Sequence, residues 1–141
     1  MGERVSGISA DRVRARVGVV AVVCAAVALL GAPGAEATAT HIRVMPDINF
    51  GSSTNYGVGC SYTIQALVTD AVAPVYFYDN GIPLSAQRPT GGTALLKWVP
   101  ATPGPHTISV VQAPDDVITA AVEVRVGTGT HLGYGCLVTG G

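Results

Sequence analysis

Apolar and polar side chains alternate along the stretch Cys60-Ser-Tyr-Thr-Ile-Gln-Ala-Leu-Val68. One face of this stretch carries Cys60, Tyr62, Ile64, Ala66 and Val68. A period of two places these side chains on one side of an extended chain, so the pattern predicts a half-buried β-strand. Leu67 is the one apolar residue that falls on the opposite face.

Similar short runs follow one another along the chain and are separated by turn residues. The predicted strands are 41–45, 60–68, 75–78, 82–84, 93–99, 107–112 and 117–126. This spacing is typical of an all-β fold, and we predict an antiparallel sandwich of about seven strands with Trp98 in its core. Pro46–Gly59 is predicted to be an irregular loop, and the glycine-rich Gly127–Gly141 would be a loose tail unless a disulfide holds it.

A tight hairpin is predicted at Asp79-Asn80-Gly81, directly after the run 75–78. The Asn-Gly pair tolerates the positive φ angles that a two-residue hairpin turn requires. Pro83 lies in the return arm and cannot donate a ladder hydrogen bond. This arm is therefore predicted to be an edge strand.

The first 37 residues have the three parts of a secretory signal peptide. Arg4, Arg12, Arg14 and Arg16 form a basic region, Val17–Ala32 is apolar, and Ala35-Glu-Ala37 is a small-residue site. We predict cleavage after Ala37, which leaves one secreted or envelope-associated domain over residues 38–141. An uncleaved membrane anchor is the alternative, although the apolar run has 16 residues against the roughly 20 that span a bilayer.

The three cysteines divide between the leader and the mature domain. Cys24 lies inside the apolar run, where we predict a small hydrophobic residue rather than a lipid-attachment site. Cys60 and Cys136 remain, and an even pair in an exported domain predicts one intramolecular disulfide. That bond would tie the tail to the strand at Ser61; an intermolecular disulfide and two free thiols are the alternatives.

Residues 38–141 carry few charges. The cationic residues are Arg43, Arg88, Lys97 and Arg125, and the anionic ones are Asp47, Asp70, Asp79, Asp115, Asp116 and Glu123, so the formal charge is −2. Because there is no basic patch to neutralise phosphates, no nucleic-acid partner is expected. The same residues include 13 Val and 13 Thr but one Lys and one Glu, a composition that favours sheet over surface helix.

Three elements in a fixed order resemble bacterial Ig-like domains of the large extracellular-repeat type. They are the stretches Val75-Tyr-Phe-Tyr-Asp-Asn-Gly-Ile-Pro-Leu84, Gly92-Thr-Ala-Leu-Leu-Lys-Trp-Val99 and Pro103-Gly-Pro-His-Thr-Ile-Ser-Val110. The resemblance covers about Cys60–Val126 and implies a seven-stranded spacer, adhesive or binding module without catalytic residues. This chain departs from the usual pattern because it has a single copy and its cysteines flank the long strands. Its layout is similar to that of small exported actinobacterial proteins.

No metal or cofactor site is predicted. His41, His106 and His131 have none of the short spacings that bring metal ligands together, and a disulfide would leave no thiolate. We expect His106 to cap or bridge locally. Asp79-Asn80-Gly81 lacks the acidic positions of a calcium loop, and Asp115-Asp116 is predicted to be a polar turn.

No catalytic residues are predicted either, so we do not expect an enzyme. The sequence has neither a Gly-x-Ser-x-Gly elbow nor an HExxH helix. Glycoside hydrolysis needs two acids across a cleft, and Glu123 is the only glutamate of residues 38–141.

Tyr76 and Tyr78 are the candidate binding surface. If Val75 and Phe77 point into the core, both tyrosines point outward on one face, where they could contact a sugar ring or a protein. Cross-strand packing on the sheet exterior is the alternative, and it is the interpretation that we favour.

The sequence thus favours a secreted, non-enzymatic Ig-like scaffold or interaction module. One alternative is a carbohydrate- or host-protein-binding adhesin, and another is an accessory or inhibitor subunit of an exported enzyme that inserts a glycine-rich loop. Extracellular protein or carbohydrate is the expected partner, with no stable membrane insertion after signal cleavage. The oligomeric state is not predicted, and an unpaired sheet edge could form a dimer by strand addition.

Overall fold

The computed structural model describes residues 38–114 and 120–141. The predicted signal peptide with its cleavage site after Ala37, Cys24 and the Asp115-Asp116 turn lie outside these residues. The strands are β1 (Ala39–Met45), β2 (Phe50–Gly51), β3 (Tyr56–Val58), β4 (Tyr62–Val68), β5 (Val75–Asp79), β6 (Ile82–Gln87), β7 (Thr93–Trp98), β8 (Gly104–Gln112), β9 (Ala120–His131) and β10 (Cys136–Thr139). In this described part of the chain, no helix has the length and apolar character needed to cross a bilayer.

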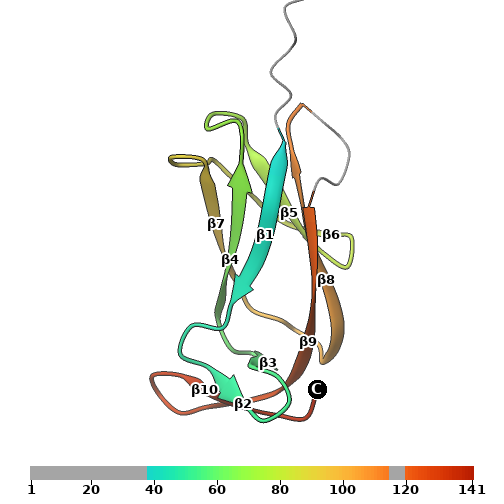
Figure 1. The fold of residues 1–141 in the computed structure, drawn as a ribbon. Helices are drawn as coiled ribbons and strands as arrows, with labels where there is room; N and C mark the ends of the chain where they lie inside the picture. Colours follow the sequence, from blue (N-terminus) through green and yellow to red (C-terminus); the bar gives the residue numbers. More distant parts are fainter. Residues whose placement is uncertain (1–37, 115–119) are drawn as a thin grey trace, which may run out of the picture. The chain divides into compact units, whose positions relative to one another are not determined.

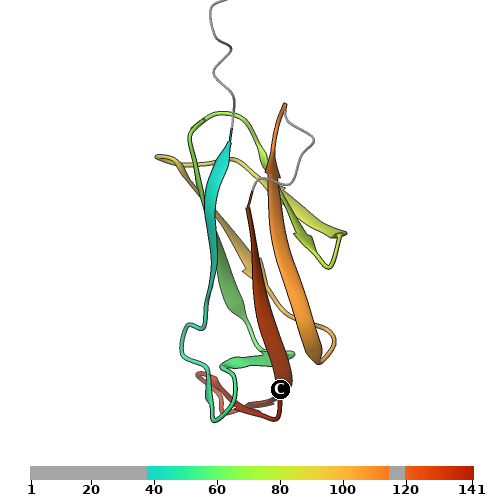
Figure 2. The same ribbon diagram turned by 45° about the vertical axis from the view of Figure 1, so that its right-hand side comes forward.

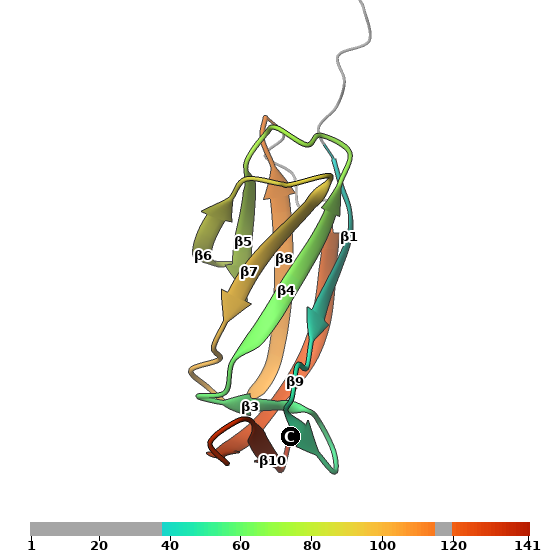
Figure 3. The same ribbon diagram turned by 90° about the vertical axis from the view of Figure 1, so that its left-hand side faces the viewer.

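The strands form two sheets that face each other (Figures 1 and 2). One sheet has the order β1-β4-β7, and the other has the order β2-β10-β9-β8-β5-β6, with β3 paired to β9. The seven longer strands pair antiparallel within their sheets. They form the Ig-like antiparallel sandwich predicted from the sequence, and the short β2, β3 and β10 are added at one end of it (Figure 3).

The core lies between the two sheets and is built from alternate residues of their strands. β4 contributes Tyr62, Ile64 and Ala66 with no exposed surface, as its alternation predicted, whereas Leu67 is 38% exposed on the other face. The second sheet buries Val75, Phe77, Ile108, Val110 and Val126. Trp98 is 3% exposed, which confirms its predicted place in the core. Burying each large apolar side chain stabilises the fold by about 1.5–3 kcal/mol.

The predicted hairpin joins β5 and β6. Asn80 and Gly81 have φ angles of 50° and 78°, the pair of positive values that a type I′ turn requires. β6 pairs only with β5 and is the last strand of its sheet. The sheet-edge position of Pro83 is therefore confirmed.

Two glycine-rich segments are more ordered than the sequence predicted. Pro46–Gly59, predicted to be an irregular loop, contains β2 and β3, which run parallel to β10 and β9 respectively. In Gly127–Gly141, β9 continues to His131 and β10 follows. The pairings of β2 with β10 and of β3 with β9 join residues far apart in the chain, so no local alternation predicts them.

Several strand limits also differ from the prediction. β8 begins at Gly104 rather than 107, so Pro105 lies inside a strand opposite Arg125.

β1 begins near one end of the domain, and the C-terminus lies at the opposite end beside β2 and β10 (Figure 1). The added strands therefore build a distinct end of the sandwich, opposite the start of β1.

Candidate functional site: a groove beside the disulfide

The predicted tyrosine surface lies on the outer side of β5. Tyr76 is 40% exposed and Tyr78 is half-buried, while Val75 and Phe77 are buried. Tyr76 is paired with Val111 of β8 and Tyr78 with Ser109, and both β8 residues are buried. The exposure of these tyrosines is consistent both with cross-strand packing on the sheet exterior and with a binding surface.

Cys60 and Cys136 form an intramolecular disulfide, as predicted. Their Cα atoms are 6.1 Å apart, and both residues are buried. The bond connects the segment before β4 to the first residue of β10. It closes the end of the sandwich at which the three short strands lie.

Asn49 holds the same end together through its side-chain amide. Its Nδ2 donates to the carbonyl oxygens of Pro46 at 3.0 Å and Ser61 at 2.9 Å. Its Oδ1 accepts a hydrogen bond from the backbone N–H of Cys136 at 2.8 Å. One buried amide therefore links the β1–β2 turn, the start of β4 and β10. Sequence reasoning missed Asn49 because it placed this residue in an irregular loop.

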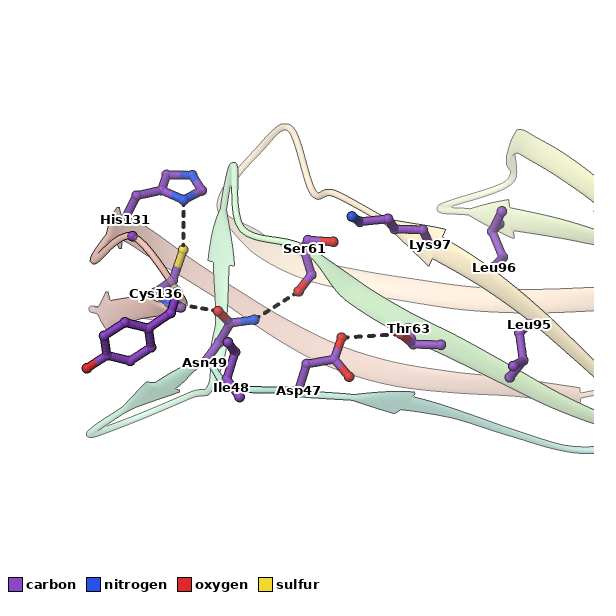
Figure 4. A pocket seen from close by; sticks show the side chains of 13 residues that line it. Asp47, Ile48, Asn49, Ser61, Thr63, Leu95, Leu96, Lys97, His131 and Cys136 are labelled. Carbon is purple, nitrogen blue, oxygen red and sulfur yellow. Dashed lines mark hydrogen bonds between the residues drawn. The ribbon is translucent and has the colours of Figure 1, made fainter.

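A groove of about 530 Å³ opens beside this junction (Figure 4). Its walls come from the β1–β2 turn, the outer side of β4 and β7, and the β9–β10 turn. The lining residues are Asp47, Ile48, Asn49, Ser61, Thr63, Leu95, Leu96, Lys97, His131, Gly133, Tyr134, Gly135 and Cys136. The volume lies within the range of small-molecule sites.

The groove combines exposed apolar surface with polar groups. Tyr134 is 77% exposed, Ile48 is 60% exposed and Leu95 is 52% exposed. Thr63 donates to the carboxylate of Asp47 at 3.2 Å, and Lys97 lies opposite Thr63 in the strand register. One carboxylate and one ammonium leave the lining with no strong charge, so it suits a neutral ligand with both apolar and hydroxyl surfaces.

The sequence analysis did not identify this groove. Its residues come from four separated segments, which only the strand register and the disulfide bring together. One signal was available: Thr63, Leu95 and Lys97 fall on the outward positions of predicted strands. Tyr76 and Tyr78 are not part of the groove, because they lie on the other sheet.

The three histidines have different surroundings. His41 is exposed on β1, and His106 is buried between Asp79 and Thr102. His131 lies beside the disulfide, with its Nδ1 atom 3.6 Å from Cys136 Sγ. Among the described residues, Cys60, His131 and Cys136 form the one group of three whose ligand atoms could hold a metal ion, all within 4.8 Å of one another.

Two tyrosines, the buried Tyr62 and the partly buried Tyr56, connect the core to this end of the domain. The hydroxyl of Tyr62 accepts from Gly57 N–H at 2.6 Å and donates to Asn55 O at 3.0 Å, and the hydroxyl of Tyr56 donates to Val44 O at 2.7 Å. Burial raises the pKa of both tyrosines above the ordinary value of 10.0, because the phenolate would lose its hydration.

This pKa shift predicts alkaline destabilisation. A raised pKa means that the folded state holds its protons more tightly than the unfolded state, so the contribution to stability is complete below pH 10.0 and is lost above it. Denaturant unfolding at a series of pH values from below to above 10.0 should show that the free energy of unfolding falls as the pH rises. Tyr62→Phe should lower the free energy of unfolding at neutral pH but make it fall less steeply at alkaline pH. An equally steep fall in this variant and in the wild type would show that Tyr62 does not cause the alkaline destabilisation.

Comparisons with known proteins give limited similarity. No protein-family model matches the chain, and no curated protein matches it. A polysaccharide lyase structure is 11% identical with a TM-score of 0.44, over 63% of this chain and 12% of that one, so the chain spans a small part of it. The fibronectin(III)-like modules of Clostridium thermocellum CbhA are 21% identical with a TM-score of 0.43, over 60% of this chain and 94% of theirs. The CARDB domain of PF1109 from Pyrococcus furiosus is 16% identical with a TM-score of 0.42, over 64% of this chain and 93% of that one.

Proposed function

We propose that this protein is an exported, non-enzymatic Ig-like module that binds an extracellular carbohydrate chain in the groove beside the disulfide. The observation that carries the proposal is the exposed ring of Tyr134, which lines the same groove as the polar side chains of Asp47, Thr63 and Lys97. A sugar ring has C–H faces that pack on an aromatic ring and hydroxyl groups that hydrogen-bond at its edge. Tyrosine provides such an apolar surface with a polar tip.

Export is supported by the leader and by the disulfide. A signal peptide over residues 1–37 with cleavage after Ala37 would deliver the domain to an oxidising compartment, where the bond between Cys60 and Cys136 persists. The β1–β2 and β9–β10 turns that line the groove lie at the end of the domain opposite the start of β1 (Figure 1). The proposal includes membership of the large extracellular-repeat type of bacterial Ig-like domains, in a small actinobacterial protein.

The absence of catalysis is supported by how the described carboxylates are used. Asp79 pairs with His106, and Asp70 accepts backbone N–H groups from Val72 and Ala73. Asp47 is the one carboxylate among the described residues that line the groove. Paired carboxylates across a cleft are what glycoside hydrolysis requires, and this groove does not supply them.

The test is binding of neutral oligosaccharides to the purified protein, measured by calorimetry across a panel of extracellular glycans. Tyr134→Ala is expected to weaken binding at least about tenfold, because it removes the aromatic surface of the groove. The matched control is Tyr76→Ala with Tyr78→Ala, which should leave binding unchanged. Circular dichroism should confirm that both variants keep the β fold.

The same panel distinguishes the other functions. If binding is lost only in the Tyr76 and Tyr78 variant, the site lies on the outer face of β5 and the proposal that the groove binds carbohydrate is wrong. If no glycan binds, the carbohydrate-binding proposal is also wrong, and the scaffold role is the function that remains. Co-purification with an exported hydrolase would favour the accessory or inhibitor role, with the Gly133–Gly135 turn as the inserted loop.

A further inference from the structure

The His131 ring is held so that one nitrogen faces the disulfide. Nε2 lies 3.0 Å from the carbonyl oxygen of Gly59, and because a carbonyl only accepts, Nε2 carries the ring proton. In the neutral ring Nδ1 then presents a lone pair, and this atom lies 3.6 Å from Cys136 Sγ (Figure 4). A hydrogen bond from the second ring nitrogen to a backbone carbonyl is the usual support of a metal-binding histidine.

The separation of these atoms matches a tetrahedral zinc site. Zn–S bonds of about 2.3 Å and Zn–N bonds of about 2.0–2.1 Å at tetrahedral angles place the sulfur and nitrogen ligands about 3.6 Å apart. Nδ1 and Cys136 Sγ already have this separation. Cys60 Sγ lies within 4.8 Å of both other ligand atoms. Reduction of the bond between the two sulfur atoms frees both of them to move to the separations of a tetrahedral site.

We propose that, in its reduced form, this end of the domain binds one Zn²⁺ through Cys60 Sγ, Cys136 Sγ and His131 Nδ1. A water molecule from the groove is the fourth ligand, since His131 and Cys136 both line the groove. The same residues would thus form a disulfide when oxidised and a metal site when reduced. This inference is independent of the carbohydrate proposal.

The chemistry requires an external two-electron reductant, and a dithiol is one such reductant. The dithiol transfers two electrons and two protons to the disulfide, becomes a cyclic disulfide itself and leaves Cys60 and Cys136 as thiols. Zn²⁺ then replaces the two thiol protons, which are released to solvent, because the thiolate is the form that binds the metal. A two-electron oxidant of the disulfide class reverses the step and releases Zn²⁺.

The backbone fixes all three ligands before any metal arrives. His131 and Cys136 are directly opposite each other in the β9–β10 pair, and the N–H of Cys136 is bound to Asn49. Gly129 leaves room for Cys60, because a Cβ atom there would collide with Cys60 Sγ. The β9–β10 pairing and the Asn49 hydrogen bond do not depend on the disulfide, so we expect reduction to change the sulfur positions more than the 6.1 Å between the two cysteine Cα atoms.

The experiment titrates Co²⁺, a spectroscopic substitute for Zn²⁺, into the protein reduced by a phosphine under argon, and measures bound Zn²⁺ by mass spectrometry. We expect one metal ion per chain with thiolate-to-cobalt absorption, and no binding to the oxidised protein. His131→Ala should weaken Zn²⁺ binding at least about tenfold. His41→Ala, which removes an exposed histidine from β1, is the matched control and should bind like the wild type.

Circular dichroism of the reduced protein covers the case in which reduction unfolds the domain. We then expect Zn²⁺ to restore the β-sheet spectrum in the wild type and in His41→Ala, and to do so less in His131→Ala. Equal affinity in His131→Ala and the wild type would overturn the proposal. Equal metal binding by the oxidised protein, or failure of Zn²⁺ either to bind or to restore the fold, would overturn it as well.

Discussion

Replacing His106 with alanine is expected to lower the free energy of unfolding by about 3 kcal/mol, because it leaves the mostly buried carboxylate of Asp79 without its charged partner. Nδ1 of His106 lies 2.7 and 2.9 Å from the two oxygens of Asp79, and Nε2 lies 2.9 Å from Thr102 O. Both neighbours accept, so the arrangement is satisfied by an imidazolium paired with a carboxylate. Urea unfolding of His106→Ala and the wild type measures the difference.

The control is His41→Ala, whose exposed side chain makes the expected change less than about 0.5 kcal/mol. A double-mutant cycle with Asp79→Ala then separates the pair from general loss of packing. Strong non-additivity is expected, because the second substitution removes the orphaned charge that the first one creates. A cost below about 1 kcal/mol for His106→Ala would show a neutral hydrogen bond instead.

The expectation that His106 bridges locally was correct but incomplete. Its contact with Thr102, four residues earlier, is local, whereas its contact with Asp79 spans 27 residues. That contact depends on the register that places Asp79 opposite Ile108 between β5 and β8. Trp98 completes the group by donating from Nε1 to Asp79 at 3.1 Å. A sequence shows each of these residues at a strand end but does not show the register that brings them together.

The long strands could be predicted because the alternation that defines each strand lies within the strand's own sequence. The alternation of residues 60–68 determines which face of β4 is buried, and the Asn80-Gly81 pair determines where β5 turns into β6. Neither inference needs to know the neighbouring strand. The sandwich class, the disulfide and the core position of Trp98 follow from such signals together with the even cysteine pair.

The groove could not be predicted because it depends on contacts between distant segments. The amide of Asn49 binds Cys136 across 87 positions, and β2 and β3 exist only as parallel partners of β10 and β9. The glycines that seemed to mark a loose tail serve close packing instead: a Cβ atom on Gly127 would collide with Thr139 O, and one on Gly135 with Ile48 O. Glycine composition alone does not distinguish these two uses.

Removing the disulfide by Cys60→Ser with Cys136→Ser is expected to produce the other large loss of stability. The bond joins residues separated by 76 positions, and the chain-entropy account assigns a loop of this length about 4–5 kcal/mol. Urea unfolding of the oxidised protein and of the double-serine variant measures the loss. The wild type reduced in the presence of a metal chelator should unfold at the same urea concentration as the variant.

Hydrogen exchange shows whether the bond acts on the unfolded or on the folded chain. If the disulfide acts by restricting the unfolded chain, the amides of the core strands β4 and β8, which exchange through global unfolding, lose protection by the full stability difference. If its main effect is to hold β10 in the native state, the amides of Leu137 and Val138 exchange faster while those of the core change little. The Asn49 hydrogen bonds and the pairing of β10 with β9 hold β10 without the bond, so we expect the first result. A double-serine variant that unfolds within about 1 kcal/mol of the oxidised protein would contradict the loop-closure account.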